Sequence, residues 1–269
     1  MKFSIVLSTQ PTSFSALAYK GDLIRNITAI KNLGFDGVEL AVRDPKLLDG
    51  DSLTSVLKEL ILPVPAIGTG QAYGEEGLSF THPDEKIRKK AVERIKAQMK
   101  FAEQFGAIVI IGLIRGKKVP DLSYDKTEEW LLEALGDCAS SNEKIKLAIE
   151  PINRYETNII NTVNSGLLLL EKLNKSNVGL LLDTFHMNIE EPSMTESIGN
   201  AGEKLFHFHM ADSNRWYPGA GHIDFNIIFD ALNEIRYSGF ASAEIMPMPD
   251  SDSAANRTME FVRTLLGHK

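Results

Sequence analysis

The chain has 269 residues, of which 43% are hydrophobic and 24% charged, with a formal net charge of −7. Acidic and basic residues are interspersed, which argues against the basic patch of nucleic-acid-binding domains. The single cysteine, Cys138, excludes an intramolecular disulfide and is interpreted as a packed thiol. The start, "MKFSIVLSTQ", has too short an apolar run for a secretory signal, and no segment is apolar enough to span a bilayer. We therefore expect a cytoplasmic protein with neither nucleic-acid nor membrane partners.

Two kinds of segment alternate along the chain. Short apolar, β-branched runs typical of buried strands cover residues 3–8, 37–42, 64–70, 107–114, 146–152, 178–185, 205–211 and 240–246. Longer stretches with apolar residues three and four apart, typical of helices, cover residues 22–34, 52–61, 84–106, 126–139, 163–174, 225–237 and 253–266. A weaker helical pattern, containing Gly199 and Gly202, covers residues 193–204.

Eight strand–helix units in one chain predict an α/β fold, a single (β/α)₈ TIM barrel over residues 1–269. No linker or low-complexity tract divides the chain, so we expect one domain. A doubly wound open sheet is the alternative, but it needs a phosphate-binding glycine loop after a strand. The best candidate, "GTGQAYGEEG", lacks the usual order of glycines. In a TIM barrel the active site lies at the C-terminal ends of the strands.

Four consecutive predicted strands end on residues whose side chains can bind metals. Each run is apolar until it reaches Glu150 in "KLAIE", Asp183 in "GLLLD", His209 in "LFHFH" and Glu244 in "FASAE". Any one acid could instead cap a helix or pair with a base, but three carboxylates at one barrel mouth repel unless a cation lies between them. Oxygen ligands with one imidazole suit a divalent metal, and we expect Mn²⁺, with Co²⁺, Mg²⁺ or Zn²⁺ as alternatives.

These strand ends lie in segments that carry a family resemblance. "IEPINRYETN", "LDTFHMNIEE", "HFHMADSNRWYPGAGHIDF" and "SAEIMP" resemble the xylose-isomerase-like (AP endonuclease family 2) sugar isomerase/epimerase superfamily, nearest its ketose 3-epimerase branch. The intervals of 33, 26 and 35 residues between the candidate ligands match that branch. In the N-terminal half, "AVRDP", "AIGTGQAY", "THPDEKIRKKA" and "VIIGLIRG" resemble the 5-keto-L-gluconate epimerases of inositol breakdown.

The resemblance implies a metal-dependent epimerase that inverts a carbon next to the ketone of a keto-sugar or keto-sugar acid. It assigns the acid and base roles to Glu150 and Glu244, which would also hold the metal. It further implies that His186 and Arg215 hydrogen-bond the oxygens around the reacting carbon, and that Glu156 holds the near end of the sugar. Two carboxylates on opposite sides of a bound sugar could remove a proton from one face and return one to the other.

A keto-sugar acid of the 5-keto-L-gluconate or D-tagaturonate type needs a cation for its carboxylate. Arg115, in "IIGLIRGKK" after the fourth strand, is the candidate, with Arg43 as the substitute. Among the remaining histidines, His207 lies one pleat deeper than His209 and is interpreted as a core histidine or one that supports a ligand.

Other functions remain open from sequence. A 1,2-sugar isomerase uses the same metal and glutamates, and a sugar-binding barrel without catalysis has the same fold. An apurinic endonuclease of this superfamily would need more histidine ligands and a basic surface. The resemblance also implies a homo-oligomer, a dimer or a tetramer.

Overall fold

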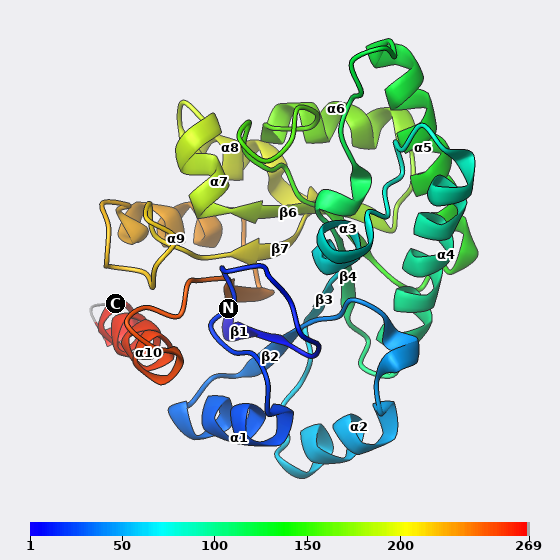
Figure 1. Ribbon diagram of the computed structural model, residues 1–269. Helices are drawn as coiled ribbons and strands as arrows, with labels where there is room; N and C mark the ends of the chain where they lie inside the picture. Colours follow the sequence, from blue (N-terminus) through cyan, green and yellow to red (C-terminus); the bar gives the residue numbers. More distant parts are fainter. Residues whose placement is uncertain (268–269) are drawn as a thin grey trace.

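The computed structural model describes residues 1–267, and eight parallel strands form its centre (Figure 1). The strands pair in sequence order, and β1 also pairs with β8, so the sheet closes into a barrel. Their bounds are β1 (Lys2–Ser8), β2 (Gly37–Ala41), β3 (Ala66–Gly68), β4 (Ile108–Ile111), β5 (Leu147–Ile149), β6 (Val178–Asp183), β7 (Leu205–His209) and β8 (Phe240–Ala243). The prediction of a (β/α)₈ barrel is confirmed.

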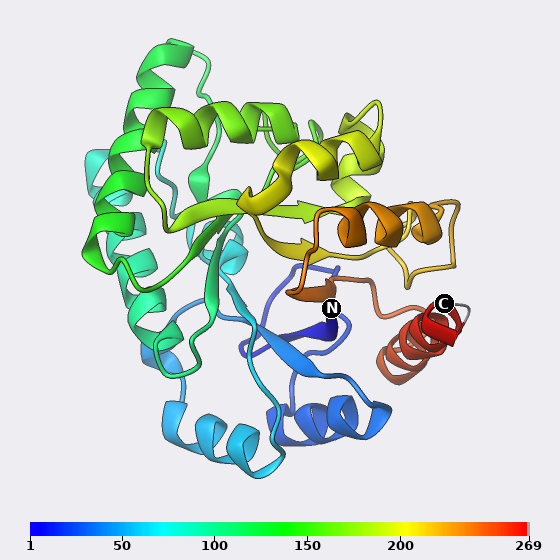
Figure 2. The same ribbon diagram turned by 180° about the vertical axis from the view of Figure 1, so that it is seen from behind.

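Helices surround this barrel on its outside, and one of them, α3, lies over the C-terminal mouth (Figures 1 and 2). They are α1 (Leu23–Leu33), α2 (Gly50–Glu59), α3 (Gly70–Glu76), α4 (Glu85–Ala102), α5 (Tyr124–Ser141), α6 (Val163–Leu173), α7 (Thr184–Glu190), α8 (Met194–Ala201), α9 (Phe225–Glu234) and α10 (Ser251–Gly267). Short 3₁₀ turns cover Pro45–Leu47, Leu113–Arg115 and Gly202–Lys204. The first and last helices, α1 and α10, pack side by side and complete the ring. Among the described residues, no helix is long and apolar enough to cross a membrane.

Local sequence explains where the helices begin. Eight of those described start after a side chain that accepts a backbone N–H of the first turn: Asp22, Asp49, Asp84, Ser123, Thr162, Asp183, Ser193 and Asp224. The weak helical pattern over 193–204 becomes α8 followed by a 3₁₀ turn, because Gly202 at positive φ ends the helix. The short helices α3 and α7 were not predicted as separate elements.

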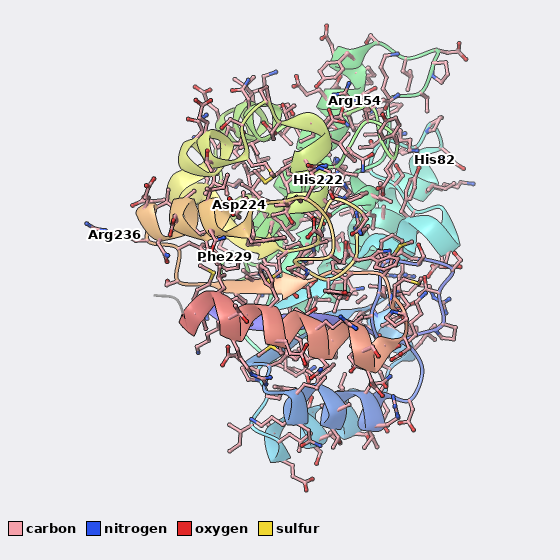
Figure 3. The ribbon with its side chains drawn as sticks, turned by 90° about the vertical axis from the view of Figure 1, so that its left-hand side faces the viewer. His82, Arg154, His222, Asp224, Phe229 and Arg236 are labelled. Carbon is pink, nitrogen blue, oxygen red and sulfur yellow. The ribbon has the colours of Figure 1, made fainter. Side chains whose placement is uncertain are left out.

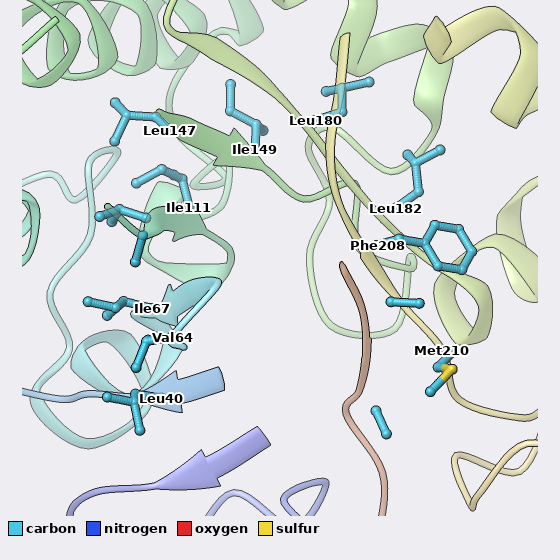
Figure 4. Packing of buried hydrophobic residues seen from close by; sticks show 14 of the residues in the cluster. Leu40, Val64, Ile67, Ile111, Leu147, Ile149, Leu180, Leu182, Phe208 and Met210 are labelled. Carbon is cyan, nitrogen blue, oxygen red and sulfur yellow. The ribbon is translucent and has the colours of Figure 1, made fainter. Parts of the chain in front are cut away.

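Side chains alternate between two cores along each strand. Outward-facing Leu40, Ile67, Ile149 and Leu182 belong to the large cluster between barrel and helices (Figure 4). The barrel interior holds a separate small cluster of Ala66, Ile110, Ala148 and Leu181. Residues one pleat further along this inner face reach the C-terminal mouth, so strand parity decides which side chains can meet there.

A register shift in β6 aligns the ends of β6 and β7, which carry two of the predicted metal ligands. Between Leu180 and Leu181 the pairing with β7 slips, so that Leu181 lies opposite His207 and Asp183 opposite His209. The carboxylate and the imidazole therefore end neighbouring strands at the same level and on the same inner face.

The buried thiol gives a direct test of the packing. Cys138 on α5 is fully buried, and burial raises its pKa to about 12. We expect native protein at about pH 8 to react negligibly with a disulfide thiol reagent, because the thiolate is both rare and shielded. Denaturant should expose one titratable thiol per chain. Rapid reaction of native protein would contradict this packing.

Candidate metal and substrate site

Four side chains at the barrel mouth come together as the strand ends predict. Asp183 and His209 are the last residues of β6 and β7, and Glu150 and Glu244 directly follow β5 and β8. Each offers one possible ligand atom, and these four atoms all lie within 4.8 Å of one another. We call these four residues the mouth cluster.

Unpartnered atoms in the mouth cluster are suited to bind a cation. Within the described part of the chain, Glu150 Oε1, Asp183 Oδ2 and His209 Nδ1 are buried and have no hydrogen-bond partner. Such groups cost free energy unless something compensates them. The other oxygen of Asp183, Oδ1, accepts the Phe185 N–H at 2.8 Å and caps α7. Asp183 thus caps a helix with one oxygen and leaves the other facing the cluster, a donor set that fits a divalent metal.

The carboxylates of the mouth cluster resist ionisation together. Burial and the neighbouring Glu244 raise the pKa of Glu150 to about 8. Burial also raises the pKa of Asp183 and of Glu244, although Arg215 beside both opposes the shift. Raised carboxyl pKa values in a cavity are typical of groups that exchange protons with a substrate.

Glu39 on β2 is a site residue that the sequence interpretation missed. Its buried carboxylate accepts from His207 Nε2 at 2.7 Å and from His209 Nε2 at 3.0 Å. The signal was present in "GVELAV", where a single acid interrupts an apolar strand on its inner face. The interpretation of His207 as a core or supporting histidine agrees with this contact.

The contact with Glu39 orients His209 toward the mouth. Because Nε2 is directed at Glu39, Nδ1 faces the mouth cluster. Burial lowers the pKa of His209, but the ion pair and hydrogen bond with Glu39 outweigh burial and raise it to about 10. A metal bound at Nδ1 must therefore displace a proton, so binding should release protons.

The sugar-binding residues implied by the resemblance lie in the same place. His186 on α7 has Nε2 3.6 Å from Glu150 Oε1, and Arg215 Nη2 donates to Glu244 Oε2. The carboxylate of Asp212 holds the loop that carries Arg215 by accepting the N–H groups of Ser213, Gly219 and Ile223. Arg215 itself has φ of 60°, a left-handed conformation that this network has to stabilise.

A cavity of about 170 Å³ connects these groups. Its inner wall includes Glu150, His186, His209, Arg215 and Glu244, and Glu156 also lines it. The segment after β1 and helix α3 form the rim, where Thr12 and Ser13 hydrogen-bond the Glu75 carboxylate. Figure 1 shows both segments in front of the strands. The volume suits a small molecule.

Arg115 does not lie where we expected it. Its side chain is fully buried and does not line the cavity, because its guanidinium donates to the backbone carbonyls of Gly112, Ile159 and Ile160. The expectation that Arg115 grips a substrate carboxylate at the mouth is corrected accordingly, since both Nη groups donate to backbone carbonyls away from the cavity. The substitute, Arg43, lies 3.6 Å from Glu76 and does not line the cavity either.

Asn153 is the second residue that the sequence interpretation missed. Its buried amide lies 2.8 Å from His186 Nδ1 and 2.9 Å from Glu156 Oε1, and so connects two cavity groups. His82 and His222, by contrast, do not line the cavity. Figure 3 shows them on two different segments of the chain.

Comparison with known proteins agrees with this geometry. Residues 27–265 match the family model described as xylose isomerase-like TIM barrel. The chain belongs to this family. It is 31% identical to the L-ribulose 3-epimerase of Methylomonas sp. (strain DH-1), over 92% of this chain and 95% of that one. It is 26% identical to the 3-dehydro-D-guloside 4-epimerase of Escherichia coli (strain K12), over 96% of this chain and 99% of that one.

A solved structure extends the comparison to three dimensions. The crystal structure of a D-allulose 3-epimerase from Methylomonas sp. in complex with D-allulose superposes with a TM-score of 0.83 and 28% identity, covering 98% of this chain and 96% of that one. The expectation of an isomerase-class enzyme is confirmed by these relatives.

The Glu39 contacts predict a large effect on stability. Glu39→Gln should lower the free energy of unfolding by about 3–5 kcal/mol, because it leaves two buried imidazoles without their carboxylate. The Glu39 contribution is fully present above the usual glutamate pKa of about 4 and is lost as pH falls toward its depressed folded value. Denaturant titration measures the change, with exposed Glu59→Gln as control. A change below about 1 kcal/mol would contradict the pairing.

The buried position of Arg115 predicts that its removal lowers stability and lowers turnover of all substrate classes equally. Arg115→Ala removes three buried hydrogen bonds and leaves a cavity, so stability should fall by about 3 kcal/mol. Turnover of keto-acid and of uncharged ketoses should fall by the same factor. The control is Lys117→Ala, which removes an exposed charge from the same loop. A loss confined to keto-acids would restore the carboxylate-binding role.

Proposed function

We propose that this chain is a metal-dependent epimerase that inverts a carbon adjacent to the ketone of a small keto-sugar. The observation that carries the proposal is the mouth cluster, with three unpartnered buried donor atoms directed into a cavity. The names of the relatives, which include 3-epimerases and a 4-epimerase, support the reaction class. The resemblance to 5-keto-L-gluconate epimerases adds keto-sugar acids to the candidate substrates.

The metal would be held by Glu150, Asp183, His209 and Glu244. We propose Mn²⁺, with Co²⁺, Mg²⁺ and Zn²⁺ as the ions to compare. When bound, such an ion polarises the ketone and adjacent hydroxyl oxygens and stabilises negative charge that develops there.

Glu150 and Glu244 are proposed as the acid and base. One removes the proton on the inverted carbon, and the electron pair moves toward the ketone oxygen to form an enediolate. The other, protonated, returns a proton to the opposite face, so the carbon is inverted and the glutamate pair carries one proton before and after turnover. His186 and Arg215 are placed to donate to the oxygens around that carbon, and Glu156 to hold a hydroxyl further along the sugar.

Charge balance supports a shared proton on this glutamate pair. We take His209 as neutral once it binds metal and Glu156 as offset by the buried Arg115. Glu39, Glu150, Asp183 and Glu244 would then carry four negative charges, while Arg215 and a divalent ion carry three positive ones. A single proton on Glu150 or Glu244 makes the site neutral. That state contains one acid and one base, as a two-base inversion requires.

Product analysis determines the substrate class and identifies the carbon that is inverted. Metal-loaded protein is incubated in deuterated water with uncharged ketoses, ketose phosphates and keto-sugar acids, and products are identified by NMR. We expect an epimer with deuterium at the inverted carbon. An aldose product would indicate a 1,2-isomerase. If no substrate class is turned over with any of the four metals, the proposal is contradicted.

Replacing either proposed acid–base residue should nearly abolish turnover. Glu150→Gln and Glu244→Gln preserve side-chain size but remove a proton carrier, a loss of about 10²–10⁴ in rate. Rates are measured at saturating metal, and unfolding transitions show that the fold is kept. Exposed Glu143→Gln serves as control. Most of the wild-type rate in either variant would rule out its assigned role.

Asp183→Asn and His209→Ala should act chiefly through metal occupancy. Each removes one donor of the mouth cluster, so excess Mn²⁺ or Co²⁺ should partly restore activity. Calorimetry measures the loss of metal affinity directly, and His82→Ala, an imidazole outside the cavity, is the control. A chelator should abolish the activity of the wild-type protein, and added metal should restore it. Full activity of extensively chelated protein would contradict the metal site.

A further inference from the structure

The amide of Asn153 contacts three groups. Its Nδ2 lies 2.8 Å from His186 Nδ1 and 2.9 Å from Glu156 Oε1, while its Oδ1 accepts the Tyr155 N–H at 3.0 Å. Asn153 is only 2% exposed, so protein groups and not water decide its orientation.

These contacts allow only one orientation of the amide. In the flipped orientation, the carbonyl oxygen would face the Glu156 carboxylate and the NH₂ group would face the Tyr155 N–H. Both contacts would be repulsive. Nδ2 therefore faces His186, and because an amide nitrogen can only donate, His186 Nδ1 must accept. A neutral imidazole has a single N–H, so its proton lies on Nε2.

The surroundings of Nε2 agree with a proton at that atom. Nε2 lies 3.6 Å from Glu150 Oε1 and 4.0 Å from Asp183 Oδ2, both acceptors. Arg215 Nη1, 3.4 Å away, could bond Nε2 only in the other tautomer. That contact is 0.6 Å longer than the one to Asn153, and the shorter bond decides the proton's position.

We propose that Asn153 is a positioning residue that holds His186 in the Nε2–H tautomer and directs this N–H into the cavity. There it donates to a substrate oxygen beside the inverted carbon, where negative charge develops. The role rests on the proposed epimerase function, but the tautomer does not. Glu156 takes part by holding the second N–H of the amide, so one carboxylate both lines the cavity and orients the asparagine.

The wild-type tautomer is the first test, and it needs no substrate. Long-range ¹H–¹⁵N spectra of uniformly labelled protein report which imidazole nitrogen carries the proton, and His186→Gln identifies the signal of His186. We expect Nε2–H. An Nδ1–H tautomer or an imidazolium at neutral pH would overturn the proposal, whether or not any variant folds and whether or not the chain proves to be an epimerase.

The second test changes one atom of the amide. Asn153→Asp replaces the donor with an acceptor, so the proton should move to Nδ1 and Nε2 should lose its N–H. We expect kcat to fall about tenfold or more with KM changed less than about threefold, because the lost donor acts mainly in the transition state. The matched control is Asn164→Asp, an exposed amide near the start of α6.

Repulsion between the new carboxylate and Glu156 is separated from the tautomer effect by a second background. In Glu156→Gln, the amide at 156 can donate to the aspartate, and the double variant is compared with Glu156→Gln alone. The proposal stands if the tautomer changes and kcat falls in both backgrounds. It is overturned if kcat falls without a change of tautomer, or if the tautomer changes and kcat does not.

Discussion

The crowding of three carboxylates at the ends of β5, β6 and β8 is the constraint on which the site depends. Glu150 and Asp183 are buried and Glu244 is partly exposed, and their oxygens lie within metal-binding distance of one another. Such an arrangement is unstable unless positive charge lies next to it. Arg215 and His209 provide part of that charge, and each is held in place by a further acid.

The two further acids act from different places. Glu39 contacts both histidines of β7 from inside the barrel, and Asp212 holds the loop of Arg215 through backbone N–H groups. Each positively charged group at the mouth is thus positioned by a carboxylate outside the mouth cluster. A divalent cation at the mouth cluster would supply the remaining positive charge.

The sequence predicted the mouth cluster because each member ends an apolar run, and parallel strands place their ends together. Glu39 and Asn153 were not predicted, for two different physical reasons. Glu39 lies within a strand, so its role depends on strand parity and on the partners opposite it. Asn153 lies in a loop, where no periodicity indicates side-chain direction. The sequence placed Arg115 correctly in the loop after β4 but could not predict its rotamer. The guanidinium turns inward because backbone carbonyls there accept its N–H groups.

The inward direction of Arg115 explains how a loop can hold Asn153 firmly against His186. Arg115 donates to Ile159 and Ile160, and two further contacts, Thr157 to Gly116 and Asn158 to Lys118, join the loops after β4 and β5. Ile160 has a φ of 52°, unfavourable for a β-branched residue, so the loop needs such support to keep its shape. An amide can select a tautomer only if its own backbone does not move. The buried guanidinium therefore serves the same site that we first expected it to enter, by immobilising the loop that carries Glu150, Asn153 and Glu156.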